Sequence, residues 1–242
     1  MTYKSDLFSG RRVLITGGTS GIGGATALAF AEHGAEVLAI GLPALPGDSP
    51  EHLRVNLQYL DVTDGEAMNT LISGLDRLDV LVNCAGIARE NGEEHTPEGW
   101  DKVLGINLTA TMRVSTLCRP LLAAQGGAIV NIASMYSTFG SDLCPAYAAS
   151  KGGIVQLTKS LALAYVNDKV RVNAVAPGWI ATPLARGRMA DNRANAEIMG
   201  RTPMNRWGEA SEVADAILFL ASPAAAYVTG ITLPVDGGYL CV

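Results

Sequence analysis

The sequence has few cysteines and no long hydrophobic run, and each scarcity excludes a class of protein. Its four cysteines, Cys84, Cys118, Cys144 and Cys241, include no Cys-x-x-Cys pair and no histidine at metal-ligand spacing. We therefore expect no metal site, and free thiols in a reducing, cytoplasmic environment. No stretch approaches the roughly 18 apolar residues of a membrane span, and Met1–Gly10 lacks the apolar core of a signal peptide.

Positive charge is also scarce. Lys and Arg number 18 against 23 Asp and Glu, so the formal net charge is −5. Nucleic acids and anionic membranes both require a basic face, so neither is expected as a partner. The 242 residues are 48% hydrophobic, and no repeat or linker divides them. We expect one domain spanning residues 1–242.

Short apolar segments alternate with amphipathic ones along the whole chain. Strands are expected at residues 13–15, 37–40, 57–60, 80–82, 128–132, 170–175 and 231–235, and helices at 25–33, 64–75, 100–122 (bent near Gly105), 145–165 and 209–220. Uninterrupted apolar strands are typical of a sheet buried on both faces. The pattern predicts an α/β protein with a three-layer doubly wound (Rossmann) fold and a seven-stranded parallel sheet.

Two segments depart from this alternation. The segment Leu42–Glu51 carries three prolines, which disfavour the helix that normally follows a second strand. The polar segment at residues 182–207 is interrupted by glycine and proline, and we expect it to be a lid. A surface loop with a short helix is a compatible alternative.

A glycine-rich turn joins the first strand to the first helix. Glycines at such a turn let the backbone approach a pyrophosphate, and the helix N-terminus offers free N–H donors. The residues expected to contact a dinucleotide here are Gly17, Thr19, Ser20, Gly21, Ile22 and Gly23. After the second strand, Gly41 and Leu42 offer neither an acid for a ribose hydroxyl nor a cation for a 2′-phosphate, although Asp48 could fold back onto the ribose. NAD is favoured because an unpaired phosphate is costly to bury, while NADP stays open.

A second group of residues has the chemistry of an acid/base site. Tyr147 and Lys151 lie four residues apart and share one helix face, where an ammonium group would lower the pKa of the phenol. Read alone, such a pair is more often a surface contact. Ser134 follows the fifth strand, at the sheet edge where ligands bind. Asn107 lies within a predicted helix, where asparagine is unfavourable, so it marks either a kink or a contact that positions Lys151.

Together with Asp61-Val62, Asn83-Cys84-Ala85-Gly86 and Pro177-Gly178, these motifs resemble the short-chain dehydrogenase/reductase family over essentially the whole length. The resemblance implies that Tyr147 is the general acid/base, that Lys151 lowers its pKa and holds the nicotinamide ribose, and that Ser134 orients the substrate oxygen. Asn107 would anchor a water beside Lys151. A homotetramer is also implied. The further cofactor contacts that the resemblance implies are Gly41, Asp61, Val62, Asn83, Ala85, Gly86, Pro177, Gly178, Ile180 and Thr182.

The substrate pocket is expected to include Tyr136, Cys144 and Trp179, which lie near the reactive residues in sequence. The tracts Asn131–Met135 and Arg206–Gly208 resemble the sugar-acid and polyol dehydrogenases of the family. The candidate partners for a substrate carboxylate are Arg89, Arg186, Arg188 and Arg193. An NADPH-dependent 3-oxoacyl thioester or ketone reductase is the alternative. A dinucleotide-binding protein without turnover is a third hypothesis, which the presence of Ser134, Tyr147 and Lys151 disfavours.

Overall fold

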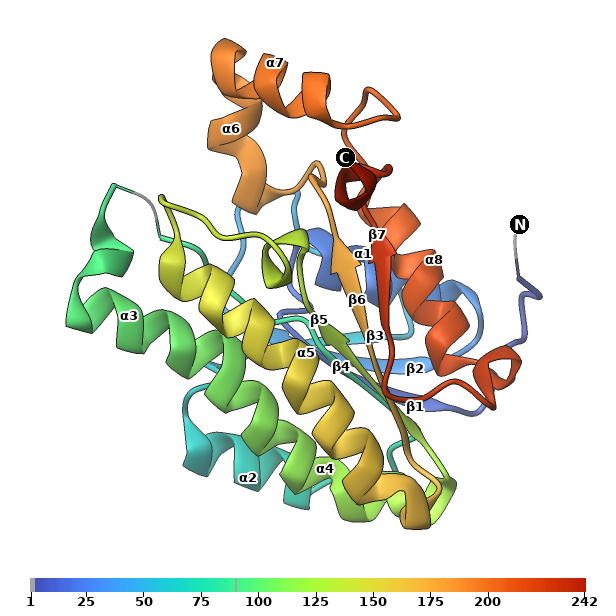
Figure 1. Ribbon diagram of the computed structural model, residues 1–242. Helices are drawn as coiled ribbons and strands as arrows, with labels where there is room; N and C mark the ends of the chain where they lie inside the picture. Colours follow the sequence, from blue (N-terminus) through green and yellow to red (C-terminus); the bar gives the residue numbers. More distant parts are fainter. Residues whose placement is uncertain (1–2, 90) are drawn as a thin grey trace.

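The computed structural model describes residues 3–89 and 91–242, which form three layers around one parallel sheet (Figure 1). Seven strands form one sheet, as the sequence predicts, and they lie in the order β3-β2-β1-β4-β5-β6-β7. They are β1 Arg12–Thr16, β2 Glu36–Gly41, β3 Val55–Tyr59, β4 Val80–Asn83, β5 Ala128–Ile132, β6 Arg171–Pro177 and β7 Thr232–Val235. Every pairing is parallel, so all carboxyl ends meet at one edge.

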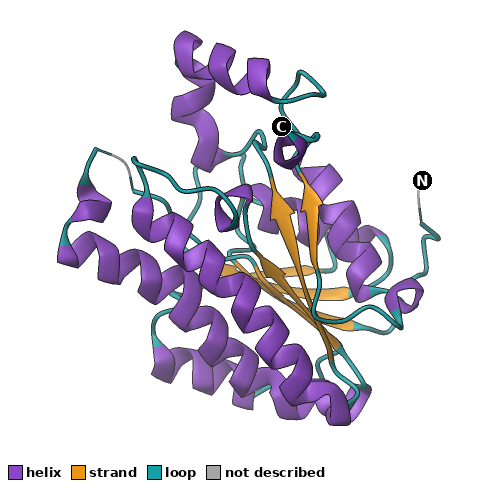
Figure 2. Ribbon diagram, in the orientation of Figure 1, coloured by secondary structure: helices purple, strands orange, loops and turns teal. Residues whose placement is uncertain are grey.

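Helices cover both faces of the sheet, as Figure 2 shows. They are α1 Gly21–Glu32, α2 Gly65–Ser73, α3 Pro97–Leu104, α4 Ala110–Gln125, α5 Pro145–Tyr165, α6 Arg186–Ala190, α7 Asn192–Arg201 and α8 Ala210–Ala221. Helices α1 and α8 pack on one face, where Phe30, Ile217 and Leu218 are fully buried. Helices α2, α4 and α5 cover the other face. Each such buried side chain stabilises the fold by about 1.5–3 kcal/mol relative to exposure.

The helix expected over residues 100–122 is divided, and it bends where the glycine predicts. Helices α3 and α4 are joined by a π-helical turn, η2, at Gly105–Thr109. The N–H of Ala110 reaches back to the carbonyl of Gly105, five residues earlier, instead of four. Asn107 is buried in this turn. The helix α1 begins earlier than expected, at Gly21, because glycines in its first turn read as loop in the sequence.

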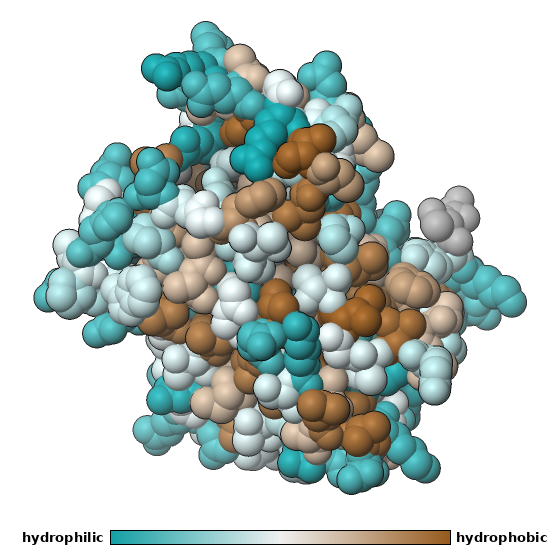
Figure 3. All heavy atoms as spheres, in the orientation of Figure 1, coloured by the Kyte–Doolittle hydropathy of each residue, from teal (hydrophilic) through white to brown (hydrophobic). Residues whose placement is uncertain are grey.

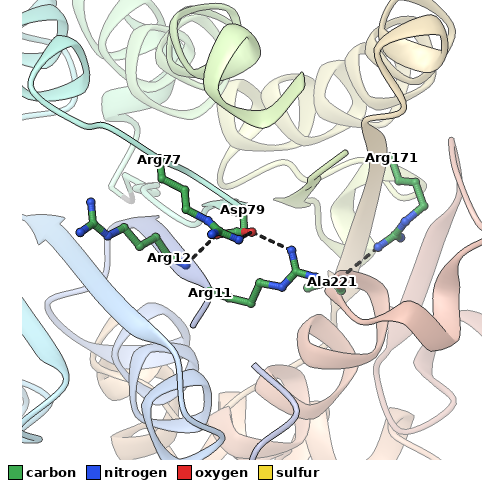
Figure 4. Close-up of polar contacts among 6 residues, drawn as sticks. All are labelled: Arg11, Arg12, Arg77, Asp79, Arg171 and Ala221. Carbon is green, nitrogen blue, oxygen red and sulfur yellow. Dashed lines mark hydrogen bonds and ion pairs between the residues drawn. The ribbon is translucent and has the colours of Figure 1, made fainter. Parts of the chain in front are cut away.

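An arginine cluster closes the sheet edge opposite the carboxyl ends (Figure 4). The carboxylate of Asp79, directly before β4, accepts hydrogen bonds from the Arg11 and Arg77 guanidiniums and from the N–H of Arg12, at 2.7–2.9 Å. These donors hold the pKa of the Asp79 carboxyl below its usual value, even though burial acts in the opposite direction. Arg171 donates to the carbonyls of Leu220, Ala221 and Ser222 and so caps the end of α8.

The segment at residues 182–207 projects from the carboxyl edge and carries α6 and α7 (Figure 1). Its two ends are pinned together, because Ile180 pairs with Gly208 and the N–H of Ala181 donates to the carbonyl of Gly208. The residues Leu42–Glu51 contain no helix, as predicted. Arg186 of α6 donates to Asp48 of that proline-rich segment at 2.5 Å, so the two irregular segments are joined.

Candidate active site

A cleft of about 570 Å³ opens at the carboxyl ends of the strands, where the sequence places its motifs. It brings together the following predicted residues: Gly17, Thr19, Ser20, Gly21, Ile22, Gly23, Gly41, Asp61, Val62, Ala85, Gly86, Ser134, Tyr136, Cys144, Tyr147, Lys151, Pro177, Gly178, Trp179, Ile180 and Thr182. Asn83 and Asn107 are the predicted site residues that do not line it.

The glycine-rich turn is packed so closely that side chains would not fit. A Cβ at Gly17 would lie 2.7 Å from the Cα of Ala85, and a Cβ at Gly23 would lie 2.1 Å from the carbonyl oxygen of Gly17. Gly17 also has a φ of +65°, which favours glycine. Ser20 precedes α1 without capping it through its side chain, so the first N–H groups of the helix face the cleft unclaimed by that hydroxyl. This arrangement suits an anionic phosphate group.

The ribose end of the cleft explains the missing acid after β2. A Cβ at Gly41 would lie 2.8 Å from the Oγ1 of Thr19, so the threonine side chain occupies the space that an aspartate there would need. Leu42, Pro43 and Ala44 supply an apolar wall instead. Asp48 is not one of the described residues that line the cleft. Its carboxylate pairs with Arg186 instead. The structure therefore does not place Asp48 at the ribose position that the sequence analysis suggested for it.

The three residues of the predicted reactive group converge on one point of the cleft. Ser134 follows β5, lines the cleft with Tyr147 and acts to lower the pKa of its phenol. Tyr147 and Lys151 lie on one face of α5, with the Lys151 Nζ 5.5 Å from the centroid of the tyrosine ring. Nζ donates to the carbonyl of Ile132 at 2.7 Å, and Lys151 is only 4% exposed. A hydroxyl, a phenol and an ammonium thus meet beside the proposed nicotinamide position.

Burial governs the pKa values of this group. It raises the pKa of Tyr147 to about 12, against the hydrogen bond from Ser134, which acts to lower it. It also lowers the pKa of Lys151 to about 8. The spacing in the sequence predicts that the ammonium group depresses the pKa of the phenol, but the pKa is raised, and desolvation is the largest cause. The phenol is therefore protonated at neutral pH and can serve as a proton donor.

Asn107 lies behind the cleft and ties two segments together. Its amide accepts from the N–H of Ile87 and donates to the carbonyl of Ile87, both at 2.9 Å, and it also donates to the Oγ of Ser150 at 3.0 Å. A Cβ at Gly86 would lie 3.4 Å from the Asn107 Oδ1 and 3.5 Å from the Lys151 Nζ. The π-helical turn thus places the amide beside the lysine, and its role in anchoring a water stays a prediction.

Asn83 occupies a different place from the one the resemblance implies. Its side chain is buried and donates to the Oγ of Ser115 at 3.0 Å and to the Oδ1 of Asn131 at 2.9 Å. Asn131 in turn donates to the Oγ1 of Thr158 at 2.9 Å. This side chain therefore links β4 and β5 to the helices behind them, and the cleft wall at this point is formed by Ala85 and Gly86.

Aromatic rings form the wall beyond the reactive group. Tyr136 makes edge contacts with both Tyr147 and Trp179, with ring centroids 6.2 Å apart in each pair, and Trp179 contacts Trp207 of the lid segment at 5.7 Å. The Nε1 of Trp179 is buried and has no hydrogen-bond partner within residues 3–89 and 91–242. Cys144 lies at the N-terminus of α5, with its Sγ 3.1 Å from the Oγ of Ser141. All three residues predicted for the substrate pocket therefore line the cleft.

Charged groups around the cleft divide the four candidate arginines. Arg89 and Arg188 line the cleft, whereas Arg186 pairs with Asp48 and Arg193 pairs with Glu197 on the exposed side of α7. Sequence reasoning missed Lys102, which also lines the cleft. It missed Glu94 as well, because a glutamate in an acidic run looks the same in sequence whether it is solvated or buried.

No group of described residues is placed to hold a metal ion, and no described helix has the length and apolar character needed to cross a membrane.

Comparisons with known proteins agree with this geometry. The family model described as Enoyl-(Acyl carrier protein) reductase matches residues 17–240. The 3-oxoacyl-[acyl-carrier-protein] reductase FabG of Thermotoga maritima is 39% identical over 241 residues, which is 95% of this chain and 97% of the relative. The 2-dehydro-3-deoxy-D-gluconate 5-dehydrogenase of Bacillus subtilis is 37% identical and covers 99% of both chains.

A solved structure is similar over almost the whole fold. It is a protein of Agrobacterium tumefaciens with bound NADP, provisionally described as a 2-deoxy-D-gluconate 3-dehydrogenase. The two share 36% sequence identity with a TM-score of 0.88, over 99% of this chain and 100% of the other.

The doubly wound sheet, the cleft at its carboxyl edge and these relatives together identify a nicotinamide-dependent oxidoreductase. The chain belongs to the short-chain dehydrogenase/reductase family, as the motifs indicate. It is an NAD(P)-dependent oxidoreductase that acts on CH–OH groups.

Proposed function

We propose that the protein oxidises a secondary alcohol of a polyol or sugar acid to a ketone, and reduces the ketone in the reverse direction. The convergence of Ser134, Tyr147 and Lys151 in the cleft carries this proposal. The relatives described as gluconate-type dehydrogenases support the substrate class. The cleft-lining Lys102 offers a cation for a substrate carboxylate, whereas Arg89 already pairs with Glu93.

The residues of the site divide the chemistry among them. A bound nicotinamide supplies the hydride acceptor or donor. Ser134 holds the substrate oxygen, and Tyr147 takes its proton in oxidation or returns it in reduction. Proton transfer by a positioned group accelerates a reaction by roughly 10²–10⁴-fold. Lys151 provides a positive charge that favours the phenolate, while the half-buried aromatic wall of Tyr136 and Trp179 limits the access of water to the reacting atoms.

Both nicotinamide dinucleotides fit the residues at the ribose end, and we propose that NAD is preferred. Gly41 and Leu42 provide no cation for a 2′-phosphate, and an unpaired phosphate is costly to bury. The relative with bound NADP supports NADP as the alternative. A fluorescence titration of the protein with NADH and with NADPH decides the preference, and tighter NADPH binding would contradict it.

A 3-oxoacyl thioester reductase is the second candidate, because the FabG relative is described as one. A long acyl carrier substrate would lie along the apolar side of the cleft formed by Leu143 and Leu184. The two candidates separate on a panel of polyols, sugar acids and β-keto thioesters. Turnover of the thioester alone, with NADPH, would replace the sugar-acid proposal.

The test of the mechanism is the substitution Tyr147→Phe. It removes the acid/base hydroxyl but keeps the ring against Tyr136, so we expect turnover to fall by at least about 10³-fold with dinucleotide binding nearly unchanged. Turnover close to wild type would exclude Tyr147 as the general acid/base. Loss of dinucleotide binding would show that the phenyl ring no longer packs correctly, and Ser134→Ala would then test the same site.

A homotetramer remains a proposal from the family resemblance. Figure 3 shows hydrophilic residues gathered over α6 and α7, while hydrophobic residues are scattered over the face of α5, α8 and the C-terminal end. Leu163, Val166 and Ile231 are among the exposed apolar residues. Light scattering measures the assembly directly, and a monomeric mass would contradict it. The cytoplasmic location stays a prediction of the cysteine pattern.

A further inference from the structure

Within the described part of the chain, the carboxylate of Glu94 is buried beside the reactive helix without a charged partner. It belongs to the short 3₁₀ turn η1, Glu93–His95, and is 1% exposed. Among the described residues its hydrogen-bond donors are two backbone N–H groups. Oε1 accepts from the N–H of Arg89 at 2.7 Å, and Oε2 accepts from the N–H of Tyr147 at 2.8 Å. A buried carboxylate without a cation is costly, so its presence calls for a reason.

The first of these bonds fixes the loop that follows β4. Ala85, Gly86, Ile87, Ala88 and Arg89 all line the cofactor cleft. The N–H of Arg89 is held by Glu94, while Asn107 holds Ile87 from behind. The position of Glu94 therefore sets the depth of one cleft wall.

The second bond fixes the start of α5. Pro145 and Ala146 are its first two residues, so Tyr147 carries one of the backbone N–H groups that no helical carbonyl satisfies. Cys144, which precedes the helix, makes no capping bond with its side chain. Glu94 takes that role from a distant part of the chain. A carboxylate is favoured at a helix N-terminus because the peptide dipoles point toward it.

One side chain thus joins the backbone of the acid/base residue to the cleft wall opposite it. A second contact braces the same turn, since the Nε2 of His95 lies 2.9 Å from the carbonyl of Asp142, in the segment that leads into α5. A shift of a reacting group by about 1 Å costs roughly 10²-fold in rate. A clamp at the Tyr147 backbone is therefore in a position to control the rate.

From this geometry we infer that Glu94 is a positioning residue, which holds Tyr147 at a fixed distance from the cofactor-binding loop. The inference rests on the proposed function, since it assigns Glu94 a part in placing the acid/base group. The charge of Glu94 acts through the backbone, because the pKa of the phenol is set by burial, Ser134 and the neighbouring Cys84, Tyr136 and Cys144.

The test compares Glu94→Gln with Glu93→Gln. The glutamine keeps the size of Glu94 and one acceptor oxygen, but turns an N–H donor toward one of the two backbone N–H groups. Glu93 is the matched control, because it is adjacent and its side chain is 54% exposed in a surface pair with Arg89. The enzyme is full length in every case, and the rate is expressed per NADH- or NADPH-binding site, counted by fluorescence titration.

We expect Glu94→Gln to lower kcat per site at least tenfold with the Kd for the dinucleotide changed less than threefold. Glu93→Gln should stay within twofold on both. A purely structural role would lower the melting temperature and the number of sites, but would leave kcat per remaining site unchanged. An unchanged kcat per remaining site in Glu94→Gln would overturn the inference.

A second measurement separates this inference from the proposed function. Amide hydrogen exchange should show lost protection in both 85–89 and 145–150 in Glu94→Gln, and in neither segment in Glu93→Gln. If the wild-type enzyme turns over no member of the substrate panel, the proposed function fails, and the exchange data alone decide whether Glu94 holds the two segments together. Unchanged exchange in both segments would overturn the clamp.

Discussion

The ammonium group of Lys151 lies 5.5 Å from the ring centroid of Tyr147 without a direct hydrogen bond to its hydroxyl. The lysine donates to the carbonyl of Ile132 instead. Burial is the largest influence on the pKa of the phenol, and it raises that pKa. The protonation state of the phenol then depends on pH and on what enters the cleft.

This relationship predicts different pH dependences for the two directions. The pKa of Tyr147 is raised to about 12 and that of Lys151 is lowered to about 8, so both groups stay protonated and the reduction rate should change little between about pH 6 and about pH 7. Oxidation needs the phenolate, whose fraction grows with pH, so its rate should rise across the same range. Initial rates in both directions check this. An oxidation rate that falls with pH, while the fold is intact by circular dichroism, would contradict it.

A second prediction concerns Gly41. Replacing it with aspartate places a Cβ 2.8 Å from the Thr19 Oγ1, so Gly41→Asp alone should weaken the binding of NADH and NADPH by about tenfold, or ~1.4 kcal/mol. The double variant Thr19→Ala/Gly41→Asp has room for the acid and should recover NADH binding but not NADPH binding. Fluorescence titration measures both, with Thr19→Ala as the control. Recovery of NADPH binding in the double variant would argue against this location of the ribose.

A third prediction concerns the pair between Arg186 and Asp48, which joins the lid segment to the proline-rich segment. Arg186→Gln should raise the dissociation rate of the dinucleotide by about threefold to tenfold, but change the free energy of unfolding by less than about 2 kcal/mol, because the Arg186 side chain is half-exposed while that of Asp48 is 17% exposed. Asp48→Asn should act alike, and the double variant should add nothing. Stopped-flow displacement measures the rate. Arg193→Gln, on the exposed side of α7, is the control, and an equal effect there would remove the pair from this role.

A fourth prediction concerns the cluster around Asp79 at the far edge of the sheet. Asp79→Asn leaves Arg11 and Arg77 without their buried carboxylate and should lower the free energy of unfolding by about 3 kcal/mol at neutral pH. The folded-state pKa of Asp79 is lowered, so the stabilisation is present above the unfolded value of about 3.9 and is lost as pH falls through the folded value. Urea titrations at several pH values measure this. The variant should lack that acid dependence.

The control for the Asp79 variant is Asp76→Asn. Asp76 pairs with Arg12 on the surface and its side chain is 77% exposed, so its loss should cost less than about 1 kcal/mol. An equal loss in the two variants would mean that the burial of Asp79 does not matter.

The sequence predicts the sheet and the reactive group well for a physical reason. Strands such as β4 and β5 are buried on both faces, so nearly every position is apolar and the segment stands out. The motif residues lie at strand ends and one helical turn apart, so local spacing is enough to bring Ser134, Tyr147 and Lys151 together.

Long-range charge partners could not be predicted in this way. Asp48 meets Arg186 and Glu94 meets Tyr147 across large separations in the chain, and in sequence each acid looks like a solvated one. The raised pKa of Tyr147 could not be predicted either, because it depends on how completely the surrounding elements bury the ring. The position of Asn83 behind the cleft depends on Ser115, which lies on a helix packed from the other side.

The π-helical turn at Gly105–Thr109 amounts to one residue inserted into an otherwise continuous helix from Pro97 to Gln125. One extra residue rotates everything after it by roughly 100°. The face of α4 that meets the sheet, with Val114, Cys118 and Leu122, is in phase only because of this offset. A one-residue deletion there would therefore give a more regular helix and a worse protein, because it would turn leucine and valine side chains toward solvent. The irregularity beside Lys151 is thus also the spacer that keeps the buried face of α4 in register with the hydrophobic core.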